Sequence, residues 1–288
     1  MFEAPDSPFL VPFDGSFRVA DAETRTTGHK KTHLQKRLKV ATRQLENLQR
    51  LLYANDSHAL LLVFQGMDAS GKDSTIRRVM RRISPTGCQA TGFKRPVSNE
   101  LDHDFLWRTT LALPQRGRIG VFNRSQYEEV LAVRVHPEML GDQRLPLRSV
   151  ERSTWDERLE SILDQEKHLA RNGTTILKFW LNVSAEEQKK RLLSRLDEPE
   201  KLWKFNPDDT VERRYWDRYM LAYEEALNAT SRPWAPWFAI PADRKPYMRA
   251  AVAELIVASL LTLAMEWPEP GAKEQERFDA ARRALEGE

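Results

Sequence analysis

The chain has 288 residues, of which 41% are hydrophobic and 30% are charged, and its formal net charge is +3. This length and apolar content suffice for one large α/β domain, and no stretch approaches the roughly 20 apolar residues that a membrane span requires. Cys88 is the one cysteine, which excludes an intramolecular disulfide and argues against a cysteine-held metal cluster. Residues 1–20 lack the basic and apolar regions of a secretory signal, so we expect a cytoplasmic protein.

The first part of the chain changes pattern near residue 30. Pro5, Pro8 and Pro12 occur without periodic spacing, which predicts an extended N-terminal arm over residues 1–29. From 30 to 53, leucine and alanine recur every three or four residues, which predicts an amphipathic helix.

Strands and helices alternate after this helix. Residues 59–64 form a short, uninterrupted apolar run, which is typical of a strand buried on both faces of a parallel sheet. Further strands are predicted at 118–122, 175–181 and 237–240, with a weaker one at 89–93. This order predicts a doubly wound α/β sheet flanked by helices, within a single domain over 30–268.

Two charged segments lie in the second half of the chain. Residues 185–229 are helical in pattern but rich in charge, and Pro199 and Pro207 interrupt them. A charged helical hairpin before the last strand predicts a lid that closes over a site, although a static pair of peripheral helices would give the same pattern. Residues 269–288 are predicted to form a charged C-terminal tail.

The segment after the first strand fits a phosphate-binding loop. Residues 66–72 read G-M-D-A-S-G-K, the first seven positions of G-x-x-x-x-G-K-[ST], directly after a predicted strand and at the start of a helix. Backbone N–H groups of such a loop cradle phosphate oxygens. We therefore predict a three-layer P-loop kinase fold. The phosphate-binding residues predicted here are Gly66, Ala69, Ser70, Gly71, Lys72, Asp73 and Ser74.

Two carboxylates distinguish this loop from the common pattern. Asp73 stands where the pattern has a Ser or Thr that holds magnesium, and Ser74 follows it. Asp68 lies inside the loop, where it would repel phosphates unless a cation or a reacting group intervened. We assign Asp68 to magnesium or to the nucleophile, and a helix cap is the alternative.

A second polar cluster begins where the predicted strand 118–122 ends, at the edge where ligands gather in open α/β sheets. Asn123 stands where P-loop enzymes usually carry an acid for magnesium. Arg124 is placed to contact phosphate. Glu128 or Glu129, about one helical turn further on, could supply the missing carboxylate.

Six motifs in order resemble the polyphosphate kinase 2 family over about residues 30–265. They are residues 66–73, 93–96, 103–108, 121–135, 196–205 and 241–245. Asn123 resembles the class III branch, whose members phosphorylate nucleoside mono- and diphosphates. The resemblance implies inorganic polyphosphate as donor, AMP, ADP, GMP and GDP as acceptors, and Mg²⁺ as cofactor. It also implies a homo-oligomer, which the leucine-rich helix favours, and no nucleic-acid partner.

The same resemblance implies roles for individual residues. The catalytic group is Asp68, Lys72 and Arg124, and the acceptor nucleotide contacts Asn123, Arg124 and Glu128. Further phosphate contacts are expected from Lys94, Arg108 and the lid arginines Arg191 and Arg195. Asp68 and Glu128 are the magnesium ligands, although neutral Asn123 leaves the choice of carboxylates open.

Two other functions are compatible with parts of the sequence. An ATP-dependent nucleoside monophosphate or small-metabolite kinase would share the loop, the sheet and the lid. It would not explain the accumulation of basic residues at 30–50 and 71–95, which favours a polyanionic donor. A regulator that binds nucleotide or nucleic acid without turnover is disfavoured because aromatic residues do not interleave with the basic ones. Base preference and the net direction of transfer are not determined by the sequence.

Overall fold

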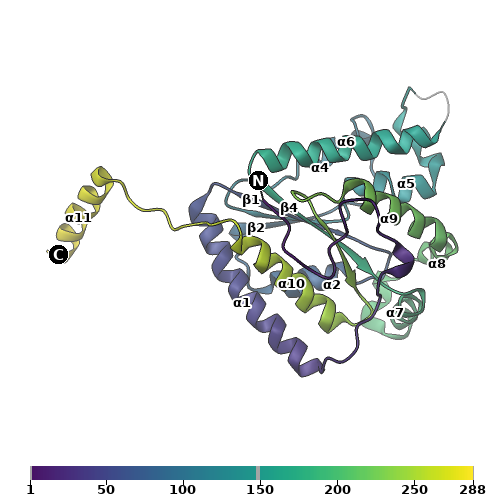
Figure 1. Cartoon of the computed structure of the whole chain (residues 1–288), viewed down its shortest axis with the longest axis horizontal. Helices are drawn as coiled ribbons and strands as arrows, with labels where there is room; N and C mark the ends of the chain where they lie inside the picture. Colours follow the sequence, from purple (N-terminus) through teal and green to yellow (C-terminus); the bar gives the residue numbers. More distant parts are fainter. Residues whose placement is uncertain (1, 147–149, 288) are drawn as a thin grey trace.

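Five parallel strands form one sheet in the computed structural model, which describes residues 2–146 and 150–287 (Figure 1). The strands are β1 (Ala59–Gln65), β2 (Cys88–Gly92), β3 (Ile119–Asn123), β4 (Thr174–Asn182) and β5 (Trp237–Pro241). Their order across the sheet is β2-β3-β1-β4-β5. The predicted α/β class with a parallel sheet flanked by helices is confirmed.

The central position of β1 follows from its composition. All seven of its residues are buried, as expected for a strand whose two faces are both covered by helices. β1 pairs with β3 on one side and β4 on the other, and Phe64 of β1 lies opposite Asn123 of β3. The segments that leave the carboxyl ends of β1 and β3 therefore start side by side.

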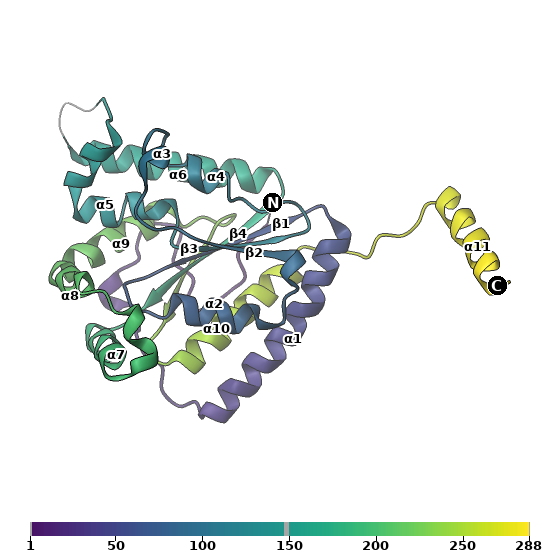
Figure 2. The same cartoon turned by 180° about the vertical axis from the view of Figure 1, so that it is seen from behind.

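Three helices cover one face of the sheet, and Figure 2 shows them together below it. They are α1 (Lys31–Asn55), α2 (Lys72–Val79) and α10 (Lys245–Leu261). The apolar stripe predicted for α1 is buried, including Leu34, Leu45 and Leu52, which have no exposed surface, and α1 packs along α10. Because this stripe is used within the chain, it lends no support to self-association, which stays a prediction.

The opposite face carries the other helices of the body (Figures 1 and 2). They are α3 (Ser98–Leu101), α4 (Trp107–Thr110), α5 (Ala132–Val135), α6 (Arg152–Arg171) and α9 (Trp216–Thr230). A 3-10 helix, η4 (Gln126–Glu129), follows β3 and leads into α5.

The predicted lid, residues 185–229, divides into a peripheral and a packed part. Its peripheral part contains α7 (Ala185–Asp197) and α8 (Asp208–Glu212) with short 3-10 turns between and after them. The packed part is α9, whose residues Ala222, Tyr223, Ala226 and Leu227 are buried in the main core. This packing confines any moving lid to about residues 185–215. The apolar face of α9 was not recognised in the sequence because the segment is rich in charged residues.

The two ends of the chain differ. The N-terminal arm contains one 3-10 turn (Val19–Asp21) and lies along the edge of the sheet, where the N–H of Val11 donates to the carbonyl of Trp237 at 2.9 Å. Near the other end, α11 (Ala272–Glu286) is wholly exposed and extends away from the body (Figure 1). Among the described residues, none of the helices is both long and apolar enough to cross a bilayer.

A buried charged network joins the sheet to the helices behind it. The Lys178 ammonium on β4 pairs with the Glu166 carboxylate on α6, and it donates to the Tyr127 hydroxyl at 3.0 Å and the Thr230 carbonyl at 2.8 Å. Lys178 and Glu166 are at most 1% exposed. Burial lowers the pKa of Lys178 to about 8, although the Glu166 carboxylate opposes this shift. This network fixes η4, which carries Tyr127, against the sheet.

Removing one partner of this pair should destabilise the fold strongly. We expect Glu166→Ala to lower the free energy of unfolding by about 3–5 kcal/mol, because it leaves a buried ammonium without its carboxylate. Urea denaturation followed by circular dichroism measures the change. The double variant Glu166→Leu with Lys178→Met is the control and should cost much less, since it removes both charges together. A loss below about 1 kcal/mol for the single variant would contradict this account of the pair.

Candidate active site

The loop from Gly66 to Gly71 connects β1 to α2 and is packed closely on both sides. Gly66 has φ +146°, and a Cβ there would lie 2.8 Å from the carbonyl oxygen of Leu181. Gly71 has φ +110°, and a Cβ there would lie 3.0 Å from the terminal methyl group of Met248. Both positions therefore require glycine, for backbone conformation and for space. Within this loop the Ser70 hydroxyl is buried and has no hydrogen-bond partner among the described residues, which is unusual for a buried polar atom.

Lys72 lies across the loop and is 7% exposed. Its ammonium donates to the carbonyl oxygens of Gly66, at 2.6 Å, and Met67, at 3.3 Å. Burial, and then the proximity of Arg124, lower the pKa of Lys72 to about 8. The ammonium is thus held at the mouth of the loop by weak carbonyl partners, which phosphate oxygens could replace.

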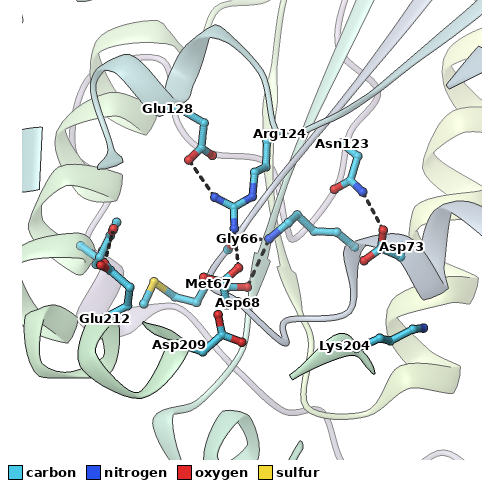
Figure 3. A network of polar contacts seen from close by, with 12 residues as sticks. Gly66, Met67, Asp68, Asp73, Asn123, Arg124, Glu128, Lys204, Asp209 and Glu212 are labelled. Carbon is cyan, nitrogen blue, oxygen red and sulfur yellow. Dashed lines mark hydrogen bonds and ion pairs between the residues drawn. The ribbon is translucent and has the colours of Figure 1, made fainter. Parts of the chain in front are cut away.

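Arg124 lies between two carboxylates that come from different segments (Figure 3). Its guanidinium pairs with Asp68 of the loop, and it donates to the Glu128 carboxylate of η4 at 3.1 Å. The two carboxylates raise the pKa of Arg124, with Glu128 the larger cause. Burial alone would raise the pKa of Asp68, but Arg124 and Lys72 outweigh burial and hold it below its usual value. Asp68 is therefore ionised at neutral pH.

Asn123 and Asp73 are brought together by the pairing of β1 with β3. The side-chain amide of Asn123 donates to the Asp73 carboxylate at 2.8 Å (Figure 3). The next residue of α2, Ser74, donates its hydroxyl to the carbonyl of Gly71 at 3.0 Å. The hydroxyl that follows the loop lysine in many P-loop proteins is thus replaced by a carboxylate with an amide partner.

The lid segment contributes Asp209 and Arg195, which form an ion pair at 3.0 Å. Arg195 also donates to the carbonyl of Lys204 at 3.2 Å. Burial, and then the nearby Asp68 carboxylate, raise the pKa of Asp209 to about 6, although Arg195 opposes the shift. The Arg195 side chain is 23% exposed, so it remains at the surface of the site.

Arg191, the other predicted lid arginine, is committed to the backbone. Its guanidinium is 7% exposed and donates to the carbonyls of Ala69, Ser70, Ala242 and Asp243 at 2.6–3.1 Å, and to the Glu187 carboxylate at 2.9 Å. These bonds use all five of its N–H groups. In this arrangement Arg191 has no donor left for polyphosphate, so we assign it to holding the loop and keep Arg195 as the lid arginine.

Lys94 and Arg108 are placed differently from the loop residues. The Arg108 guanidinium is buried, donates to the carbonyl of Lys94 at 2.7 Å and lies over the Phe93 ring. Lys94 is exposed. No contact links either side chain to the loop among the described residues, so their phosphate contacts stay predictions.

A cavity of about 20 Å³ lies between the loop, η4 and the lid segment. Its lining includes Asp68, Arg124, Glu128, Asp209 and Tyr223. This volume holds on the order of one water molecule. A nucleotide can occupy this space only after the lid segment or these side chains move.

The described residues contain no cluster of three or more His, Cys, Asp or Glu side chains that could hold a metal ion by themselves. A magnesium ion often takes only one or two protein carboxylates and completes its shell with phosphates and water. Asp68 can supply such a carboxylate. Glu128 suits the role less well, because both of its carboxylate oxygens face donors, Oε2 the Arg124 guanidinium and Oε1 the Gln65 amide, whereas Arg124 pairs with one oxygen of Asp68.

Sequence analysis missed several residues of the site. Asp209, Glu212 and Tyr219 line the cavity from the lid segment, and Gln188 of α7 donates to the carbonyl of Asp68 at 2.9 Å. No motif marks them, because they meet the loop only through the packing of the lid segment. The sequence signal for these residues was the pair of acidic residues after Pro207. This pair did not stand out because the whole segment is rich in charged residues.

Comparisons with known proteins show which family and fold the chain resembles. The sequence profile of the family described as Polyphosphate kinase 2 matches residues 28–266. A protein of Rhodopseudomonas palustris named ADP-polyphosphate phosphotransferase is 49% identical, over 88% of this chain and 91% of its own. One of Meiothermus ruber, named AMP/ADP-polyphosphate phosphotransferase, is 43% identical over 91% and 95%. The crystal structure of polyphosphate kinase 2 from Arthrobacter aurescens superimposes with a TM-score of 0.87 and 37% identity, over 99% of this chain and 97% of the other.

The raised pKa of Asp209 predicts a specific dependence of stability on pH. An acid whose pKa is higher in the folded state than in the unfolded chain stabilises the fold below its unfolded pKa of 3.8, and this contribution is lost as pH rises through about 6. The melting temperature of the wild type, relative to that of Asp209→Asn, should therefore fall between pH 4 and pH 7. Scanning calorimetry of both proteins measures this difference, and Asp208→Asn, at an exposed neighbouring position, is the control. A constant difference across this range would contradict the assignment.

Proposed function

The chain belongs to the polyphosphate kinase 2 family, and from this membership we propose that it transfers phosphoryl groups from inorganic polyphosphate to nucleoside mono- and diphosphates. The observation that carries the proposal is the ion pair between Arg124 and Asp68, which places Arg124 beside the phosphate loop. A cradle for one phosphate and a cation for another lie at the ends of two adjacent strands. This is the arrangement that transfer between two phosphorylated substrates requires.

The chemistry rests on positioning and on neutralisation of charge, because phosphoryl transfer needs little covalent assistance from the protein. We propose that the loop N–H groups and Lys72 hold the phosphoryl group that moves. Arg124 then contacts the acceptor phosphate and keeps it in line. Asp68, ionised and close to both cations, orients them toward the phosphates.

Magnesium is the cofactor that we propose, with Asp68 as its protein ligand. Asp68 would hold the ion, which would neutralise charge on phosphate oxygens. Asp68 suits it because its carboxylate lies within the loop and is ionised. Glu128 is better explained as the partner of Arg124 and Gln65, because both of its carboxylate oxygens face donors.

Acceptance of both AMP and ADP is proposed on two grounds. The relative from Meiothermus ruber is named for both acceptors, and Asn123 bonds to Asp73 instead of presenting a second carboxylate beside the loop. A neutral residue at this position reduces repulsion of acceptor phosphates, whatever their number. GMP and GDP are included in the proposal, without a preference between the bases.

A donor comparison tests the proposal directly. With Mg²⁺ present, we expect polyphosphate to convert ADP to ATP and AMP to ADP and ATP, and we expect ATP to be a poor donor to AMP. Chromatography of the nucleotide products measures all three reactions. Activity with ATP but not with polyphosphate would establish the ordinary-kinase alternative. Conversion of ADP alone would contradict the proposed acceptance of monophosphates.

The two lid arginines should differ when each is replaced by alanine. Arg195→Ala should raise the apparent KM for polyphosphate by roughly tenfold or more, because a charge-assisted contact is lost, and it should weaken the salt dependence of donor binding. Arg191→Ala should instead lower the melting temperature and kcat, because it frees the loop carbonyls. Steady-state kinetics at several salt concentrations measure both, with Arg116→Ala as control, because exposed Arg116 lies at the amino ends of the strands, opposite the loop. Unchanged donor dependence in Arg195→Ala would show that polyphosphate follows another path.

A further inference from the structure

Gln65, the last residue of β1, is a buried polar residue that the proposed mechanism does not use. It has no exposed surface and follows an apolar run that fills the rest of the strand. A buried amide without hydrogen bonds costs about 1–3 kcal/mol. Both the nitrogen and the oxygen of the Gln65 amide therefore need hydrogen-bond partners.

Both ends have partners when the amide is oriented so that its nitrogen faces η4. In this orientation the nitrogen donates to Oε1 of Glu128 at 2.9 Å. The oxygen accepts from the backbone N–H and from the hydroxyl of Ser125, each at 3.1 Å. Amide orientation is assigned from such bonds, and the opposite orientation would place two acceptors, the amide oxygen and a carboxylate, against each other.

These contacts fix Glu128 from two directions. Its Oε1 faces Gln65, and its Oε2 accepts from Arg124 at 3.1 Å. Arg124 itself has φ +65°, in the left-handed region, and a non-glycine residue keeps such a conformation only where surrounding contacts impose it. Gln65 holds the residue after Arg124 through Ser125 and holds the side-chain partner of Arg124 through Glu128.

We propose that Gln65 is a positioning residue that sets the direction of the Glu128 carboxylate, and through it the Arg124 guanidinium, toward the acceptor nucleotide. The proposal rests on the proposed function only in taking Arg124 as a contact of the acceptor. Polyphosphate, held by the loop and the lid, should not depend on Gln65. Glutamine fits the position because glutamate would repel Glu128. An apolar residue would leave Oε1 of Glu128 without the amide donor.

A kinetic separation of the two substrates tests the proposal. Gln65→Leu and Gln65→Glu should each raise the acceptor KM about 10- to 100-fold, the effect of losing a hydrogen bond to a charged group, and leave the KM for polyphosphate within about twofold. Asn182→Leu is the matched control. It removes another buried amide from a strand end, one that donates only to the N-terminal arm among the described residues, and it should change neither KM. Equal changes in both KM values for the Gln65 variants would overturn the proposal.

A double-mutant cycle with Glu128→Gln distinguishes positioning from general damage to the fold. If Gln65 acts through Glu128, Gln65→Leu should have little further effect on acceptor KM in the Glu128→Gln background. A full additive effect there would overturn the proposal. If Gln65→Leu does not fold, Gln65→Glu, which is of nearly equal size, carries the same cycle.

The outcome can be separated from that of the proposed function. If the wild type uses ATP instead of polyphosphate, the proposed donor is wrong, and the cycle is measured with ATP as donor. If the wild type turns over neither, calorimetric binding of ADP to the same variants replaces acceptor KM. A loss of ADP affinity confined to the Gln65 variants would support the positioning role, and equal affinity in all of them would overturn it.

Discussion

The ion pairs of Arg124 with Asp68 and Glu128 connect the phosphate loop to η4. They exist because β1 and β3 are adjacent and parallel, with Phe64 opposite Asn123, so that the segments leaving both strands emerge together. A loop built for phosphates would otherwise leave cations facing one another. The carboxylates balance this charge. Burial, and then a neighbouring like charge, lower the pKa of Lys72 and raise that of Asp209.

Buried and accessible arginines divide the work within the lid segment. Arg191 ties the start of α7 to the loop and to the segment after β5, and it gives partners to carbonyl groups that the tight loop cannot satisfy by itself. Arg195, one turn further on, is held by a half-buried acid and one carbonyl. The part of α7 that carries Arg191 is therefore held to the loop, whereas the Arg195 side chain keeps some exposed surface.

The features that could be predicted from the sequence are those encoded locally. Apolar runs marked four strands and a weaker signal marked β2, and the glycine pattern marked the loop, because strand burial and loop conformation depend on neighbouring residues. Contacts between segments could not be predicted in the same way. The bond of Asn123 to Asp73 and the contact of Gln65 with Glu128 depend on strand register. Arg191 and Arg195 are four residues apart on one helix, and only tertiary packing shows that the first is buried.

The different environments of the two chain ends bear on how this protein can be joined to other molecules. Near the N-terminus, Phe9 and Val11 are hydrogen-bonded to the outer edge of β5, so that the arm covers a strand that would otherwise be open to pairing with another chain. A fusion partner or a solid support attached there would strain this cover. Attachment beyond α11, which stands clear of the body, leaves both the sheet edge and the mouth of the loop undisturbed (Figure 2).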